Sequence, residues 1–358
     1  MSVRWRASWA PGGYRRGDAL GAEEAHVAPI SDVREISNLA YGFIASKVLF
    51  AALNAKIFDM LAGGPRRLSD LQGETGIGGN RLETLLTACV SLGLIEDGAD
   101  GFANAPACQQ YLVSTSPLYF GDYFRFQIDR QLYPLLLNLD KALRAQAPAS
   151  VYDVMENPEE ADYFTRAQHV GSLGPAAVIQ KQVDLTGATR LLDVAGGSGA
   201  FSITLCRRFP TLHATILDLP NVTRVAERYI AGAGLADRIR VLSGDALSTT
   251  WPGDQDVVLL SYLLSAVGGP AIPRLFQLSY AALRGGGTLL VHDFFVDDDR
   301  RGPRGAALWF VPFLFNPEAV SFTPAGLQDK IRAVGFRDIE VRHVIPGLTR
   351  LMVAWKPG

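Results

Sequence analysis

The chain has 358 residues, enough for two domains, and its 34 Lys and Arg residues nearly balance 36 Asp and Glu residues. This balance leaves no overall field to attract nucleic acid or an anionic membrane, so we expect neither as a partner. The three cysteines, Cys89, Cys108 and Cys206, lack the spacing of a zinc site or a disulfide framework. We therefore expect no metal centre and a cytoplasmic location.

Residues 1–30 show no periodicity and no apolar stretch, which predicts a flexible tail without a secretory signal. Residues 31–115 are predicted to form a winged-helix-like dimerisation domain. Helical spacing from Val33 to Leu61 predicts one long amphipathic helix, and two short helices and a β-wing that turns at Gly98–Gly101 follow it. Residues 68–115 carry six acids and a single base, Arg81, so this domain would repel DNA phosphates, and we expect a homodimer instead.

Residues 116–185 are predicted to be a helical linker and substrate lid, and residues 186–358 an α/β domain. From residue 190 onward, seven short apolar runs alternate with helical stretches, which predicts a Rossmann-like, seven-stranded sheet covered on both faces. Only "IPGLTR" separates the last two runs, too short a segment for a crossover helix, so the final strand should be antiparallel. The apolar segment 307–315 is too short to span a bilayer, and we expect no membrane span.

The loop after the first of these strands, in "LLDVAGGSG" (191–199), is shaped to approach a ligand closely. Asp193 ends this strand, Asp218 ends the next, and Asp245 follows the third. These acids suit an ammonium, a pair of ribose hydroxyls and an adenine amine, whereas a pyrophosphate would be repelled. The ligand that fits is S-adenosylmethionine, although each acid can instead serve only as a helix cap. The predicted cofactor-binding residues are Asp193, Gly196, Gly197, Gly199, Asp218, Leu219, Gly244, Asp245, Ala246 and Ser261.

With these motifs in this order, residues 33–356 resemble class I S-adenosylmethionine-dependent methyltransferases of the small-molecule, caffeate and carotenoid O-methyltransferase type. The D-x-G-G-G-x-G motif of that family reads Asp193–Gly199, with Ala195 in place of the first glycine. Its L-D-L-P motif is Leu217–Pro220, and its G-D motif is Gly244-Asp245. The resemblance implies methyl transfer to a small aromatic or polyene acceptor of the natural-product type.

The chain departs from this family where a Leu-His-Asp-Trp stretch normally supplies the catalytic histidine. Here residues 264–267 read Leu-Ser-Ala-Val, so Ser265 replaces the base. This favours methylation of carbon or nitrogen, as in two divergent relatives that the chain resembles, bacteriochlorophyllide C-methyltransferase and phenazine N-methyltransferase. The alternatives are O-methylation with another base, such as His169, and a member of the family that binds the cofactor for a non-methylating reaction.

Other residues are candidates for catalysis and for the acceptor pocket. The predicted catalytic residues are His169, Ser265, His292 and Tyr262, and the predicted substrate-binding residues are Phe126, Tyr133, Tyr163, Trp309 and Phe313. The two rival classes are a nicotinamide oxidoreductase and a winged-helix regulator. The first would need a glycine at the third position of the dinucleotide fingerprint, where Ser202 stands, and the second would need a basic recognition helix.

Overall fold

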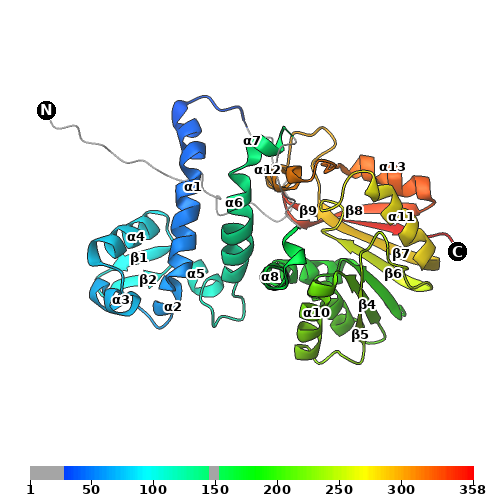
Figure 1. Cartoon of the computed structure of the whole chain (residues 1–358), viewed down its shortest axis with the longest axis horizontal. Helices are drawn as coiled ribbons and strands as arrows, with labels where there is room; N and C mark the ends of the chain where they lie inside the picture. Colours follow the sequence, from blue (N-terminus) through cyan, green and yellow to red (C-terminus); the bar gives the residue numbers. More distant parts are fainter. Residues whose placement is uncertain (1–27, 145–152) are drawn as a thin grey trace. The chain divides into compact units, whose positions relative to one another are not determined.

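A computed structural model of the chain describes residues 28–144 and 153–358, which form two compact units divided between Gly121 and Asp122 (Figure 1). The flexible tail predicted for residues 1–30 lies almost entirely outside the described residues. The segment 116–185, predicted as linker and lid, is shared between the units, because only its first residues belong to the N-terminal one. Its role as a lid stays a prediction.

The N-terminal unit is mainly helical. It contains α1 (Val33–Asn54), α2 (Ile57–Met60), α3 (Leu68–Thr75), α4 (Gly79–Ser91), β1 (Ile95–Gly98), β2 (Gly101–Asn104) and α5 (Pro106–Tyr111). The two strands form an antiparallel hairpin with Gly98 opposite Gly101, at the turn that the sequence predicts. Gly101 has a φ of +117°, and a Cβ there would lie 2.4 Å from the Arg66 carbonyl oxygen, so this turn requires glycine.

The prediction of one continuous helix from Val33 to Leu61 is wrong, because the backbone breaks after Asn54. Lys56 adopts a left-handed conformation with a φ of 57°, which ends the regular hydrogen-bond ladder before α2 begins. Side-chain periodicity does not reveal such a break, since Ile57 and Phe58 on its far side are still apolar and buried.

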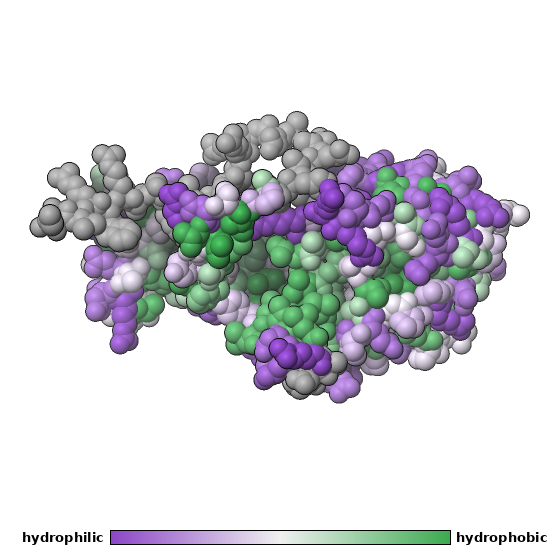
Figure 2. Space-filling view, turned by 90° about the horizontal axis from the view of Figure 1, so that it is seen from above, coloured by the Kyte–Doolittle hydropathy of each residue, from purple (hydrophilic) through white to green (hydrophobic). Residues whose placement is uncertain are grey.

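Helix α1 exposes more apolar surface than a solvated helix normally does. Phe50, Ala52 and Leu53 are its buried residues. Its large exposed apolar side chains are Val33, Ile36, Leu39, Tyr41, Phe43 and Ile44. Figure 2 looks onto the N-terminal end of α1 and shows apolar side chains there. Within the described residues, α1 is also long and apolar enough to cross a membrane by length and composition alone. A face of this kind marks a surface that another apolar surface covers.

The second unit begins with helices. They are η1 (Tyr123–Leu132, a π-helix), α6 (Tyr133–Leu136), α7 (Leu139–Ala142), the 3-10 turn η2 (Asp153–Glu156) and α8 (Pro158–Gln182). Asn157 caps α8, because its side chain accepts hydrogen bonds from the amides of Glu159 and Glu160, and Pro158 occupies the first turn. This long helix leads directly into the sheet.

The sheet has seven strands in the order β5-β4-β3-β6-β7-β9-β8. The strands are β3 (Arg190–Val194), β4 (His213–Asp218), β5 (Ile239–Ser243), β6 (Gln255–Ser261), β7 (Leu283–Phe294), β8 (Arg337–Ile345) and β9 (Thr349–Trp355). The helices among them are α9 (Ala200–Arg208), α10 (Pro220–Gly232), α11 (Ala271–Ala282), α12 (Arg304–Trp309), η3 (Val311–Phe315) and α13 (Pro324–Val334). Strand β9 pairs antiparallel with both β7 and β8, which confirms the antiparallel final strand. The α/β fold with a seven-stranded sheet is also as predicted.

The central strands are apolar along their whole length because each face of the sheet has its own core. In β6, Val258 and Leu260 belong to the core that contains Leu275 of α11 and Leu327 of α13. The alternate residues Val257 and Leu259 belong to the core formed with α8, α9 and α10. Figure 1 shows these helices on the two faces of the sheet.

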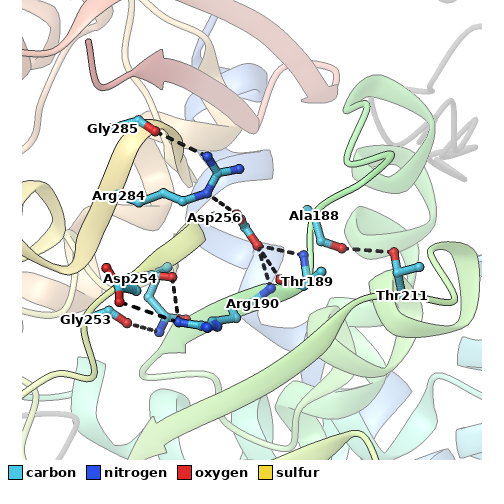
Figure 3. Close-up of polar contacts among 10 residues, drawn as sticks. Ala188, Thr189, Arg190, Thr211, Gly253, Asp254, Asp256, Arg284 and Gly285 are labelled. Atoms are coloured by element: carbon cyan, nitrogen blue, oxygen red, sulfur yellow. Dashed lines mark hydrogen bonds and ion pairs between the residues drawn. The ribbon is translucent and has the colours of Figure 1, made fainter. Parts of the chain in front are cut away.

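At the edge where β3 and β6 begin, the Asp256 carboxylate joins three strands (Figure 3). One carboxylate oxygen accepts hydrogen bonds from the Thr189 amide (2.7 Å), the Thr189 hydroxyl (3.0 Å) and the Arg190 amide (2.9 Å). The other oxygen accepts from the Arg284 guanidinium, which extends from β7. Burial raises the pKa of Asp256, but these hydrogen bonds outweigh it and lower the pKa to about 2.

We expect Asp256→Asn to lower the free energy of unfolding by about 2–3 kcal/mol, because an amide cannot accept from all of these donors. Urea denaturation, with the slope m unchanged, measures this loss. The matched control is Asp254→Asn, since the Asp254 side chain is 83% exposed and its ion pair with Arg190 spans 3.8 Å. We expect the control to change stability by less than about 0.5 kcal/mol, and equal effects of the two variants would contradict the role of Asp256.

Candidate active site

The second unit contains a cavity of about 380 Å³ at the C-terminal ends of β3, β4 and β6. Ligands bind at this edge in doubly wound sheets, because the strand-to-helix loops there present backbone groups and polar side chains. The lining residues are Met155, Phe164, Thr165, Gln168, Ser172, Ala195, Gly196, Gly197, Ser198, Phe201, Leu217, Asp218, Leu219, Val222, Gly244, Asp245, Ala246, Leu247, Ser261, Tyr262, Leu263, Ala266 and Val267.

The glycine loop between β3 and α9 forms one wall. Ala195, Gly197 and Gly199 all have positive φ angles, of 55°, 58° and 79°. Ala195 stands where the resembled family has glycine, and an alanine in this conformation costs about 1 kcal/mol. The alanine amide donates a 2.7 Å hydrogen bond to the Leu217 carbonyl, which fixes the first residue of the loop against β4.

Asp193 lies directly behind this loop and is fully buried. One of its oxygens accepts a 2.6 Å hydrogen bond from the Ser202 hydroxyl, while Oδ1 has no hydrogen-bond partner among the described residues. A Cβ at Gly196 would come within 2.7 Å of the carboxylate carbon, so only glycine allows the loop to pass this close. Burial raises the pKa of Asp193 to about 7, and the nearby Asp218 adds to this rise.

Asp218 ends β4 and lines the cavity. Its two oxygens accept 2.7 Å hydrogen bonds from the amides of Gly197 and Leu219, so this carboxylate also braces the glycine loop. Burial raises the pKa of Asp218 to about 6, although the two amide donors act in the opposite direction.

The third predicted acid, Asp245, lines the cavity from the loop after β5 and is exposed. It accepts a 2.7 Å hydrogen bond from the Leu247 amide. The structure brings most of the predicted cofactor-binding residues into this one cavity. Those that line it are Gly196, Gly197, Asp218, Leu219, Gly244, Asp245, Ala246 and Ser261. Asp193 and Gly199 lie behind the lining surface.

Helix α8 contributes polar lining residues that the sequence analysis did not single out. Thr165, Gln168 and Ser172 are spaced by three and four residues, so they share one face of the helix, and all three line the cavity. Thr165 is 1% exposed, and in the part of the chain that the structure describes its hydroxyl has no hydrogen-bond partner. Small polar residues at this spacing on a helix that enters the sheet were the available signal.

His169, on the same helix, does not line the cavity. Its Nδ1 lies 2.8 Å from the Ser198 hydroxyl, and its ring stacks on Tyr229 with centroids 3.8 Å apart. Burial lowers the pKa of His169 to about 4, so the ring is neutral near pH 7.

His292, on β7, is fully buried behind Ser261. Its Nδ1 shares a 2.9 Å hydrogen bond with the Ser261 hydroxyl, and its Nε2 has no partner within residues 28–144 and 153–358. Burial lowers the pKa of His292 to about 3. Tyr262 lines the cavity and packs edge-on against the His292 ring. Burial raises the pKa of Tyr262 well above its usual range, so its hydroxyl stays protonated.

Ser265 is 2% exposed and does not line the cavity, whereas its neighbour Ala266 does. Its amide donates a 3.1 Å hydrogen bond to Asp293, which is fully buried. The segment that carries the base in the resembled family is therefore held here by a backbone contact.

None of the five predicted substrate-binding aromatic residues lines the cavity. Phe126 and Tyr163 pack together with ring centroids 4.8 Å apart, on η1 and α8. Trp309 stacks on Phe294, and Phe313 packs against the same ring. Phe294 also contacts Tyr262 of the cavity wall, so Trp309 and Phe313 lie one ring behind that wall. Tyr133 begins α6. The roles of these residues stay predictions.

Comparison with known proteins identifies the family. A model of the O-methyltransferase domain matches residues 145–337, more than half of the chain. The chain belongs to the O-methyltransferase family. A model of the O-methyltransferase dimerisation domain matches residues 37–114, a range that includes most of α1.

Individual relatives agree with this assignment. The methyltransferase is 32% identical to a 3-hydroxy-5-methyl-1-naphthoate 3-O-methyltransferase of Streptomyces sahachiroi, over 90% of this chain and 94% of the relative. It is 28% identical to the N,N-dimethyltransferase OxyT of Streptomyces rimosus, over 76% of this chain and 81% of the relative. Its fold matches human N-acetylserotonin methyltransferase in complex with S-adenosylmethionine, with a TM-score of 0.83 and 24% identity, covering 93% and 100% of the two chains.

The methyltransferase is thus an S-adenosylmethionine-dependent enzyme, and its dimerisation domain supports a homodimer. The site fits this cofactor, because a buried Asp193 oxygen without a partner among the described residues lies directly behind a loop in which Gly196 leaves no room for a Cβ. Within residues 28–144 and 153–358, no group of three His, Cys, Asp or Glu side chains is arranged to hold a metal ion.

We expect the affinity for S-adenosylmethionine to fall as the pH is lowered. Asp193 and Asp218 have raised pKa values of about 7 and about 6, so both are ionised at pH 8 and largely protonated at pH 5. Since the cofactor is cationic, binding at pH 5 should be at least about tenfold weaker than at pH 8, measured by calorimetry. The control Asp218→Asn should bind more weakly at pH 8 and show a smaller dependence on pH. Equal affinity of the natural chain at both pH values would contradict this.

Proposed function

We propose that this methyltransferase transfers a methyl group to nitrogen or carbon of a small aromatic or polyene acceptor, in preference to oxygen. The observation that carries this proposal is the make-up of the cavity. Among the described residues that line it, the ionisable ones are Asp218, Asp245 and Tyr262. Two of these belong to the part of the cavity that suits the cofactor, and the third keeps its proton. The described lining residues therefore offer no imidazole or amine to accept a proton from a phenol.

We assign the cofactor contacts on chemical grounds. Asp193 suits the ammonium of the methionine end, Asp218 the two ribose hydroxyls and Asp245 the adenine amine. Gly196 and Gly197 let the backbone approach, while Ser261 and Ala246 complete the wall. The cofactor supplies a methyl group already activated on a sulfonium, so the protein's task is to orient the acceptor and exclude water.

The remaining wall supports an apolar, flat acceptor. Phe164, Phe201, Leu263 and Val267 line the cavity, and Tyr262, which also lines it, keeps its proton. We propose that Phe126, Tyr133, Tyr163, Trp309 and Phe313 shape the route to this wall as the outer part of the acceptor site.

The fate of the acceptor's proton favours nitrogen or carbon as the atom that is methylated. A nitrogen lone pair attacks the methyl carbon directly, and an electron-rich carbon loses its proton only after attack. In both cases a weak acceptor such as water suffices. This chain, in which Ser265 stands in place of the base, resembles in this respect the divergent relatives that lack the usual histidine.

O-methylation is the second candidate, and the printed name of the Streptomyces sahachiroi relative, a 3-O-methyltransferase, favours it. This function would need a base such as His169 or His292. Their pKa values, about 4 and about 3, would make either ring a weak base.

A matched pair of acceptors distinguishes the two candidates. With S-adenosylmethionine at saturating concentration, we expect 1-naphthylamine to gain one methyl group at a rate that does not change between pH 6.5 and pH 8.5. With 1-naphthol, the rate should rise by about tenfold per pH unit, because only the phenolate reacts without a protein base. Mass spectrometry of the products gives both rates. Faster turnover of 1-naphthol, with a rate independent of pH near 7, would contradict the proposal and favour a base in the protein.

A further inference from the structure

His169 occupies a place that links three elements of the second unit. It comes from α8, its Nδ1 lies 2.8 Å from the hydroxyl of Ser198 on the glycine loop, and its ring stacks on Tyr229 of α10 at an angle of 18°. A ring held on one face by stacking and on one edge by a hydrogen bond has little freedom to turn.

The glycine loop itself has few side chains that can hold it. Between Gly196 and Gly199, Ser198 is the one residue with a side chain, and it is 3% exposed. The loop backbone is braced at Gly197, whose amide donates to Asp218. Glycines at positive φ leave an isolated loop with many conformations, so the contact from Ser198 to His169 removes much of the remaining freedom.

The position of His169 along α8 connects this contact to the cavity. Thr165, His169 and Ser172 are spaced by four and three residues, which places them on one face of the helix. Thr165 and Ser172 line the cavity, and His169 reaches the loop opposite them. The His169–Ser198 hydrogen bond therefore joins the helix wall to the loop wall.

We propose that His169 is a positioning residue, which fixes the glycine loop for the cofactor through Ser198 and takes no part in the chemistry at the acceptor. This inference deepens the cofactor part of the proposed function, and it does not depend on which acceptor atom is methylated. It holds in either tautomer of the ring, because the Ser198 hydroxyl can donate or accept.

The test is a double-mutant cycle read by calorimetric binding of S-adenosylhomocysteine, which requires no acceptor and no turnover. We expect His169→Ala and Ser198→Ala each to weaken binding by about tenfold. The double variant should bind no more weakly than either single variant, because both changes break the same contact. His169→Asn should recover part of the affinity, since its amide can donate or accept near the position of Nδ1.

A matched control is His213→Ala, because His213 lies at the opposite end of the sheet, where β4 begins, and should bind like the natural chain. Unchanged affinity in His169→Ala, or additive losses in the double variant, would overturn the proposal. If His169→Ala does not fold, the test is the affinity of Ser198→Ala for S-adenosylhomocysteine. Unchanged affinity of that variant would overturn the proposal. Failure of the natural chain to bind the ligand would instead count against the cofactor site itself.

Discussion

The rest of this site depends on the carboxylates of Asp193 and Asp218, at the C-terminal ends of β3 and β4. Asp193 is fully buried, and the groups that act on its pKa and on that of Asp218 include no cation. An ionised carboxylate that is shielded from water costs free energy unless a partner of opposite charge binds to it. A cationic, phosphate-free nucleoside supplies that partner, and a dinucleotide would add negative charge instead. The glycine loop, the close approach at Gly196 and the brace from Asp218 to Gly197 all serve to place this charge within reach of a ligand.

The side chains that line the cavity beside these carboxylates determine which chemistry the acceptor can undergo. The lining of the cavity combines the polar groups that suit the cofactor with apolar side chains such as Phe164, Phe201 and Leu263. Ser265 stands where the family's base is expected, yet it is buried and its amide is bound to Asp293. A site of this kind supports alignment and exclusion of water more readily than proton removal. Both histidines near the cofactor loop are instead bound to serines.

Much of this site could be predicted from the sequence, because strand ends and glycine loops leave local patterns. Asp218 and Asp245 directly follow apolar runs, and a parallel sheet brings such ends to one edge. The short gap before the last strand likewise determined its antiparallel direction. The break at Lys56 could not be predicted, since a single left-handed residue does not interrupt the apolar periodicity. The polar lining residues of α8 were not predicted, because the burial of small polar residues such as Thr165 and Ser172 depends on tertiary packing. The aromatic residues near 126 and 309 pack on one another, and composition alone does not separate a core from a pocket wall.

A crystal structure of the chain grown with S-adenosylhomocysteine tests the central claim most directly. The account predicts that the amino-acid end of the ligand lies against the Gly196–Gly199 loop on the side of Asp193. It also predicts that both ribose hydroxyls lie within hydrogen-bond distance of the Asp218 carboxylate. A ligand bound elsewhere, or a ribose that leaves Asp218 bonded only to its own backbone amides, would contradict it.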